Sequence, residues 1–504
     1  MTTHINLSHI RHVVQQYFQY VVLSHKWEDN EPLFQEVIQI TVYGLGDSPT
    51  HDKLQTYCKI ARKAGFRWAW SDTVCINKSD NSVLQESLVA MFKWYQGAAL
   101  MIVFLRGVNS SSLPGALAGS IWNTRGWTLQ EYIAAKKIHF YTEDWTPYRD
   151  LPLSNHKESS EVIAEMEQAT GMSAQQLMSL RPGLSNIREK LCLASTRRTT
   201  RVEDAAYSLL GIFEAAGISA IYGEGEVSLG RLLANIVTRS GDASVLAWTG
   251  ERNRFNSCLP ARISVFNEPA ASHIPSPIPN SEMEHLITAL RPPSFDRDVA
   301  LGLYDRLNDL STPRFAESRM TLSCIAFRLP TFTAYRRTYR VNTTLFGMLE
   351  VRTRHDLSRL KSLYLVHPWL DALLDHEDVE DDGMPLPSPY PDDDEISDDE
   401  NDDEDGDDEG ETDEDDDVSL FPEPESPSLA VPASVAPVDR ETGARRLAVR
   451  LRQPFGALLL APKVEDRRIV GYQRVAADVL ITVQLGEHVS LADILNNVRT
   501  LDVL

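Results

Sequence analysis

A segment of the chain, NTRGWTLQEYI (123–133), holds an arginine, a tryptophan and a glutamate close together. Trp127 and Glu131 are four residues apart in it, and residues at that spacing lie on one face of an α-helix. A carboxylate and an indole on one face can line a pocket together. Glu131 is therefore either a surface or capping carboxylate or a residue held there for chemistry, with Trp127 beside it.

The same residues also have a purely structural interpretation. Thr128-x-x-Glu131 matches a capping box, in which the glutamate only accepts a hydrogen bond from a backbone N–H at the start of a helix. A helix that starts at Thr124 instead would place Glu131 in its second turn, beside Trp127. The local sequence by itself favours the cap, and both interpretations stay open at this level.

The elements that would position these residues follow from the hydrophobic pattern. Short apolar runs alternate with amphipathic stretches from Tyr20 onward, which is the pattern of a parallel sheet covered by helices. Helices are predicted from about Asp52 to Gly65, after Asn81, and in the 123–133 segment. The predicted strands are YVVLS (20–24), RWAWS (67–71), ALMIVFL (99–105) and KIHFY (137–141). The predicted fold class is therefore α/β.

Further candidate site residues stand where the predicted strands end, because ligands of open α/β sheets bind at the carboxyl ends of the strands. Asp72 follows the second strand, and a turn or a helix cap would explain it equally well. A guanidinium or an ammonium group, from Arg125 or Lys26, would suit a pyrophosphate, and Trp27 would suit stacking on a base. The first strand ends in the candidate binding residues Ser24, His25, Lys26 and Trp27.

Two other groups of residues point less specifically to chemistry. Cys75, His25 and Asp72 supply the residue types of a thiol nucleophile, a base and an orienting carboxylate, but TVCIN is an apolar context typical of a buried, inert thiol. YGEGE (222–226) has two glycines without the strand, helix and lysine of a phosphate-binding loop. A turn is the better prediction for it.

Length, charge and cysteine content exclude several other classes of function. At 504 residues the chain exceeds one ordinary core, so several folded units are expected. The formal charge is -23, but residues 391–417 contain 20 Asp and Glu and no Lys or Arg, which leaves about -3 for the rest. The folded parts therefore lack the excess of basic residues that is typical of nucleic-acid-binding proteins. Five scattered cysteines without a CxxC pair argue against a disulfide framework, and no metal site is expected.

A cytoplasmic protein without a membrane span is the expectation for location. The cysteine usage fits a reducing compartment, and the first residues lack the pattern of a signal peptide. The longest apolar run, 97–105, is half the length of a membrane span.

Five segments are predicted along the chain. Residues 15–150 carry the α/β pattern, and 151–250 form a helical annex whose clearest helix, TTRVEDAAYSLLGIF, starts with a capping box of Thr200 and Glu203. Residues 251–374 form the first part of a β-rich domain, with Pro-rich loops at 269–294 followed by β-type runs, and such runs resume in 443–504, for example in RRLAVRLRQPFGALLLAP. The intervening 375–442 is too rich in Pro, Ser and acidic residues to order itself. The prediction is one C-terminal β-rich domain interrupted by a disordered acidic loop.

Three blocks of sequence carry a resemblance to a known family. They are YVVLSHKWED, GFRWAWSDTVCINKSD with the following MFKWYQGAALMIVFL, and TRGWTLQEYIAAKKIHFY. In order and spacing they resemble the fungal heterokaryon incompatibility (HET) domain, and the later RRTTRVEDAAYSLLGIF and YGEGE resemble the segment that often follows it. The resemblance covers roughly residues 20–240. It implies non-self recognition and programmed cell death in a filamentous fungus, switched on by self-association.

The HET domain is in turn remotely similar to TIR domains, which have a flavodoxin-like parallel sheet and many of which cleave NAD. A first strand ending in Ser24 is similar to the first TIR box, and Asp72 ends the second strand as an Asp does there. Trp127 and Glu131 resemble the segment that carries the TIR catalytic glutamate. The resemblance implies a TIR-like fold, with NAD or a related nucleotide as a substrate and no resident cofactor, and it favours catalysis over the cap for Glu131.

One carboxylate suffices for that reaction. The bond from ribose to nicotinamide already has a cationic leaving group, so no general acid has to protonate it. A single carboxylate near the ribose stabilises the oxocarbenium-like transition state, a simplified form of what glycoside hydrolases do with two. The charged form does this work, so the role does not require a raised pKa.

Two hypotheses about function follow. In the first, the α/β domain with its annex hydrolyses NAD or a related nucleotide and Glu131 is essential. In the second, the same domain is a non-catalytic signalling scaffold that triggers cell death through protein partners, since a fold does not fix a function. Replacing Glu131 with glutamine distinguishes them, because a cap loses stability whereas a catalytic carboxylate loses activity.

Overall fold

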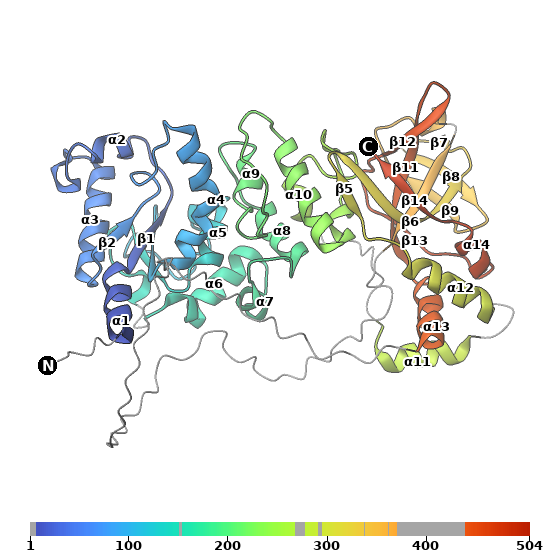
Figure 1. Cartoon of the computed structure of the whole chain (residues 1–504), viewed down its shortest axis with the longest axis horizontal. Helices are drawn as coiled ribbons and strands as arrows, with labels where there is room; N and C mark the ends of the chain where they lie inside the picture. The colour runs from blue at the N-terminus through green and yellow to red at the C-terminus, as the bar shows by residue number, and fades with distance from the viewer. Residues whose placement is uncertain are drawn as a thin grey trace, which may run out of the picture. The chain divides into compact units, whose positions relative to one another are not determined.

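The computed structural model describes residues 7–150, 154–267, 278–290, 295–336, 338–360, 362–369 and 439–504 (Figure 1). The predicted disordered loop, 375–442, lies outside these residues up to position 438, and its last three positions belong to helix α13 (Arg440–Arg450). The predicted α/β class is confirmed: a parallel sheet with covering helices comes first, and a β-rich region lies in the C-terminal half.

The first sheet consists of the four predicted strands. They are β1 (Tyr20–His25), β2 (Trp68–Trp70), β3 (Leu100–Leu105) and β4 (Ile138–Thr142). Their order is β2-β1-β3-β4 and every pair is parallel. All strands therefore start at one edge of the sheet and end at the other, which brings the residues after β1 and β2 together at the carboxyl edge.

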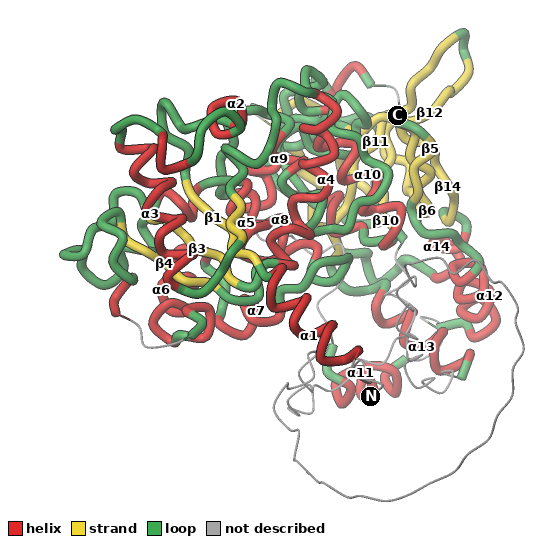
Figure 2. Tube along the Cα trace, turned by 60° about the vertical axis from the view of Figure 1, so that its left-hand side comes forward, coloured by secondary structure: helices red, strands yellow, loops and turns green. Residues whose placement is uncertain are grey.

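Helices cover both faces of this sheet (Figure 2). Alternate residues of a strand point to opposite faces, so Val21 and Leu23 pack with α3 (Pro49–Lys63), whereas Val22 packs with residues of α4 (Asn81–Gly97) and α5 (Trp127–Ala134). Both faces of β1 and β3 are buried, which explains their nearly continuous apolar sequence. The remaining helices here are α1 (Leu7–Phe18) and the short α2 (Phe34–Val37).

Helices continue after the sheet, as predicted for the annex, but the capping box predicted there is wrong. Its helices are α6 (Ser160–Thr170), α7 (Ala174–Ser179), α8 (Ile187–Ser195), α9 (Asp204–Tyr207) and α10 (Val227–Ser240). Helix α9 is one turn long and has no side-chain cap, because the carboxylate of Glu203 accepts hydrogen bonds from the backbone N–H groups of Gly223 and Gly225. YGEGE is a turn, as predicted, and the N–H groups of both its glycines already donate to Glu203.

In the described part of the C-terminal half, the strands form two sheets. The larger joins β10 (Leu363–Pro368), β11 (Phe455–Glu465), β12 (Arg468–Arg474), β14 (Val498–Val503), β6 (Arg319–Leu329) and β5 (Arg314–Ala316) in that order, with β13 (Ile481–Val483) on β11. The smaller joins β7 (Thr333–Tyr335), β8 (Thr338–Thr343) and β9 (Gly347–Val351). Strands from before and after the acidic loop pair with each other, so both chain segments build one sheet.

Helices that the sequence did not predict accompany these sheets. They are α11 (Asn280–Ala289), α12 (Arg297–Asn308), α13 and α14 (Leu491–Leu495). The strand expected in RRLAVR is wrong: it belongs to α13, which buries Ala444, Leu447 and Ala448 at helical spacing. The alternation of arginine with apolar residues is the local pattern of a strand, but burial of one helical face favours the helix instead. None of the described helices is long and apolar enough to cross a membrane.

Candidate functional site

Helix α5 decides between the two interpretations of Glu131. The helix starts at Trp127 with Gly126 at its N-cap position, and no side chain caps it. The Thr128 hydroxyl donates to the carbonyl oxygens of Trp122 (2.7 Å) and Arg125 (3.0 Å). The capping box is therefore wrong, and Glu131 lies in the second turn, although the helix starts later than Thr124.

Glu131 is held by the end of β1. The Ser24 hydroxyl donates a hydrogen bond to Glu131 Oε2, and the indole N–H of Trp122 donates to Ser24 Oγ over 2.7 Å. Only 7% of Glu131 is exposed. Burial raises the pKa of its carboxyl group to about 8; Asp72 adds to the rise, while Ser24, Arg125 and Arg197 oppose it. The carboxyl group is thus mostly protonated at neutral pH, because a buried charge is costly.

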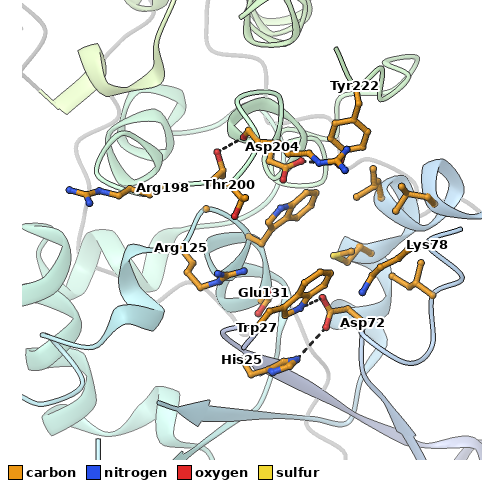
Figure 3. A pocket seen from close by; sticks show the side chains of 18 residues that line it. His25, Trp27, Asp72, Lys78, Arg125, Glu131, Arg198, Thr200, Asp204 and Tyr222 are labelled. Carbon is orange, nitrogen blue, oxygen red and sulfur yellow. Dashed lines mark hydrogen bonds and ion pairs between the residues drawn. The ribbon is translucent and has the colours of Figure 1, made fainter. Parts of the chain in front are cut away.

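A cavity of about 320 Å³ opens above Glu131 at the carboxyl edge of the sheet (Figure 3). Aromatic rings, cations, carboxylates and one apolar wall from α4 line it together. Its lining includes His25, Trp27, Asp72, Lys78, Leu84, Leu88, Met91, Arg125, Trp127, Glu131, Arg198, Arg201, Asp204 and Tyr222. Aromatic faces beside cations fit a ligand that has both flat rings and negative charge.

Asp72 forms the second carboxylate of the cavity. Trp27 Nε1 donates to Asp72 Oδ2 over 2.8 Å, and His25 Nε2 lies 3.4 Å from Asp72 Oδ1. Although burial alone would raise its pKa, the contacts with His25, Lys78 and Trp27 lower the pKa of Asp72 below its ordinary value. The site therefore holds a charged carboxylate, Asp72, and a carboxyl group, Glu131, whose pKa lies near neutral pH. Two such groups in one cavity are a pattern of acid–base sites.

Two cations at the cavity have unused donors. Among the described residues, neither Lys78 Nζ nor Arg125 Nε has a hydrogen-bond partner, although both atoms are buried. Lys78 Nζ lies 3.6 Å from the centre of the Trp27 ring. A buried donor without a partner costs free energy, so these two groups are suited to receiving an anionic ligand.

The annex closes the far wall of the cavity. Arg198 N donates to Thr124 O (2.7 Å) and Gly126 N donates to Arg198 O (2.9 Å), so the annex loop runs beside the start of α5. A Cβ at position 126 would lie 2.4 Å from Thr199 Cγ2, which explains glycine there. This contact directs the loop 198–201 into the cavity. Tyr222 donates to Asp204 Oδ1 (2.9 Å) on the same wall.

Most predicted site residues meet here. His25, Trp27, Asp72, Arg125, Trp127 and Glu131 line the cavity. Ser24 lies behind Glu131 as its hydrogen-bond partner, and Lys26 is not part of the lining. Cys75 is not part of it either, and desolvation raises the pKa of its thiol, although the residue as a whole is exposed, so the thiol-nucleophile alternative loses support.

Sequence reasoning missed Lys78, which lies six residues after Asp72, and four residues from the distant annex segment. Those four are Arg198, Arg201, Asp204 and Tyr222. The run RRTTR (197–201) was a usable signal, because three arginines in five residues rarely serve a core. Among the described residues, no group of three His, Cys, Asp or Glu side chains is placed to hold a metal ion.

Comparison with known proteins agrees with the resemblance seen in the three sequence blocks. Residues 20–120 match the family model described as heterokaryon incompatibility protein (HET). The chain is 32% identical over 249 residues to the vegetative incompatibility protein HET-E-1 of Podospora anserina. That alignment covers 46% of this chain but only 17% of the relative's own length. No solved structure matches the chain.

Proposed function

We propose, from the premise that this chain is a heterokaryon incompatibility (HET) domain protein, that it hydrolyses NAD or a related nucleotide with Glu131 as the essential carboxylate. The cell-level role would be non-self recognition leading to programmed cell death, switched on by self-association. The observation that carries the proposal is the placement of Glu131 and Trp127 in one cavity with the unpartnered donors of Lys78 and Arg125.

The sheet topology supports a TIR-like interpretation of the fold. The order β2-β1-β3-β4 is that of the first four strands of a flavodoxin-like sheet. In such sheets ligands bind where the strand order reverses, outside the carboxyl ends of β1 and β3. Ser24 and His25 end β1 at this place, and the cavity adjoins them.

The chemistry requires a carboxylate at the ribose. In the proposed reaction the bond between ribose C1′ and the pyridinium nitrogen breaks, and nicotinamide leaves neutral with the bonding electron pair. Water then adds to the oxocarbenium-like ribose and releases a proton, which gives ADP-ribose. Glu131 stabilises the cationic ribose from the cavity floor. The pyridinium charge of the substrate would favour ionisation of Glu131 on binding, because an opposite charge nearby lowers the pKa of a carboxyl group.

Other residues of the cavity would hold the rest of the dinucleotide. Arg125 and Lys78 would bind the pyrophosphate oxygens, and Trp27 or Trp127 would stack on a base. Asp72, which stays charged, would accept hydrogen bonds from ribose hydroxyls. None of these roles needs a metal ion or a second cofactor.

The pH dependence of the reaction directly tests the raised pKa of the Glu131 carboxyl group. Since the charged form of Glu131 acts and the pKa in the free site is about 8, we expect kcat/KM to rise by about tenfold per pH unit below that value and to level off above it. Nicotinamide release measured over about pH 5.5 to 9.5 gives the profile. A flat profile across neutral pH would contradict the assignment.

Arg125 offers a separate test of substrate binding. We expect Arg125→Gln to raise KM for NAD by about tenfold or more, because a charge-assisted hydrogen bond to the pyrophosphate is lost. Arg125 also lowers the pKa of Glu131, so its loss should move the acid limb of kcat/KM to higher pH. Arg359→Gln is the matched control, since that side chain is 86% exposed in the C-terminal half. If Arg125→Gln changes neither KM nor the acid limb of the kcat/KM profile, Arg125 does not take part in the site.

The experiment that tests the function is nicotinamide release from NAD by the purified full-length chain, at a series of protein concentrations. Release that increases steeply with protein concentration would support both hydrolysis and activation by self-association. A folded protein that stays monomeric by size exclusion, releases no nicotinamide and still kills fungal cells on expression would favour the scaffold.

A further inference from the structure

Helix α1 exposes its apolar side chains. Ile10, Val13, Val14, Tyr17 and Phe18 follow the spacing of one helical face, and each is between 45% and 58% exposed. The helix is attached at its C-terminal end, where Phe18 stacks on Trp68 and Trp68 Nε1 donates to Tyr17 O over 3.1 Å. An apolar face of this regularity that remains uncovered marks an interaction surface.

The exposed face of α1 continues into an aromatic groove. A hollow of about 480 Å³ lies where β1 and β2 begin, lined by Phe18, Tyr20, Trp68, Ala69, Trp70 and Trp94. Trp68 itself is 48% exposed. We call Ile10, Val13, Val14, Tyr17, Phe18 and Trp68 the amino-edge surface, because the parallel strands start beside it.

Basic residues rim this surface. Arg11 on α1, Arg62 and Lys63 at the end of α3, and Arg67 before β2 are all exposed. The Arg67 guanidinium lies 4.9 Å from the centre of the Tyr17 ring, so the basic and aromatic groups are in contact. Residues 10–20 and 59–70, which form the surface and its rim, include no Asp or Glu. The rim is therefore positive in a chain whose net charge is -23.

We propose that the amino-edge surface docks onto an anionic lipid bilayer. A short amphipathic helix with aromatic and aliphatic residues on one face and basic residues beside it suits the headgroup boundary of such a membrane. Tyrosine and tryptophan favour that boundary because their rings are apolar and their N–H or O–H groups are polar. The 12 residues of α1 lie on the bilayer and do not span it.

Other occupants fit this surface less well. A second copy of the chain, placed symmetrically, would bring two basic rims together, and like charges repel. The acidic segment 391–417 of the same chain has complementary charge, but Ile396 is its only large apolar residue. It would neutralise the rim without covering the apolar stripe. An anionic bilayer satisfies both the charge and the apolar area.

Docking in this way would leave the proposed site open. The strands of the parallel sheet start at the amino-edge surface and end at the edge that carries the cavity. A membrane-bound molecule would therefore direct its cavity away from the lipid. This inference does not depend on what the cavity does.

The test is flotation of the full-length chain with vesicles of phosphatidylcholine, with or without phosphatidylserine. We expect binding only with phosphatidylserine, weakened by salt. Ile10→Gln/Val14→Gln should reduce binding by about tenfold or more, since both side chains leave the apolar face while glutamine preserves the helix. Arg62→Gln/Lys63→Gln/Arg67→Gln should reduce it and remove the salt dependence. The matched control is Ile469→Gln/Val464→Gln, which replaces the same residue types at similarly exposed positions of the β11–β12 hairpin.

Three results would overturn the inference. One is equal vesicle binding by the wild type and Ile10→Gln/Val14→Gln, and another is no vesicle binding by the wild type at low salt. The third is a concentration-dependent dimer that Ile10→Gln/Val14→Gln abolishes, with no vesicle binding, which would assign the surface to a second copy. Thermal unfolding of each variant, unchanged from the wild type, shows that the substitutions act at the surface.

Discussion

Replacing Glu131 with glutamine should reduce nicotinamide release from NAD by about 10²- to 10⁴-fold, the range expected when one essential charged group is lost from an active site. Glutamine keeps the shape of the side chain and can still accept the hydrogen bond from Ser24, so the cavity should persist. What disappears is the negative charge that stabilises the cationic ribose.

The measurement is nicotinamide released per molecule of full-length protein, compared with Glu143→Gln. Glu143 lies just after β4 near Arg106, outside the cavity, and its replacement removes the same charge. A Glu131→Gln protein with full activity would end the proposal that this carboxylate is catalytic. Loss of activity in both variants would point to a general effect of charge instead.

The same substitution should stabilise the fold at alkaline pH. The pKa of Glu131 is about 8 in the folded protein and close to 4.5 in an unfolded chain. Between these two values the folded state holds a proton that the unfolded state has lost, so stability falls as pH rises through this window. Glutamine cannot ionise, and it avoids that loss. We expect Glu131→Gln to exceed the wild type by roughly 3 to 5 kcal/mol at pH 9.

Urea unfolding at several pH values, followed by a probe in the α/β domain, measures this difference. The advantage of Glu131→Gln over the wild type should be absent below about pH 4, where Glu131 is neutral in both the folded and the unfolded state, and should grow up to about pH 8. A constant or shrinking advantage would mean that Glu131 is already charged in the folded site. This test is independent of the substrate, so it would still report on the carboxyl group if NAD proved to be the wrong ligand.

Stability and function oppose each other at this residue. A buried carboxyl group without a strong cationic partner is costly to ionise, and a chain selected for stability alone would place a neutral residue there. A carboxyl group with a raised pKa, held in a cavity between tryptophans, is typical of a functional site. The activity assay and the unfolding experiment on Glu131 therefore both test the same feature, the buried carboxyl group.

The sequence by itself determined the α/β layout. Strands such as LMIVFL are apolar throughout because both faces of a parallel sheet are buried, so their pattern is local and readable. Asp72 and His25 were placed correctly at the carboxyl edge for the same reason: the end of a strand fixes the edge at which a residue lies. The remote similarity of the HET domain to TIR domains added the preference for catalysis over the cap at Glu131.

Only the tertiary structure decided the rest. The choice between cap and cavity for Glu131 depended on where helix α5 starts and on the hydrogen bond from Ser24, which is far from Glu131 in sequence. Arg198 and Tyr222 reach the cavity because the annex loop pairs with the start of α5, and no local pattern encodes such a contact. The local sequence of helix α13 has the pattern of a strand. Packing against α12 buries one face of the helix and so favours the helical conformation. Hydrophobic periodicity is a property of neighbouring residues, whereas a site and its pKa values arise from residues that folding brings together.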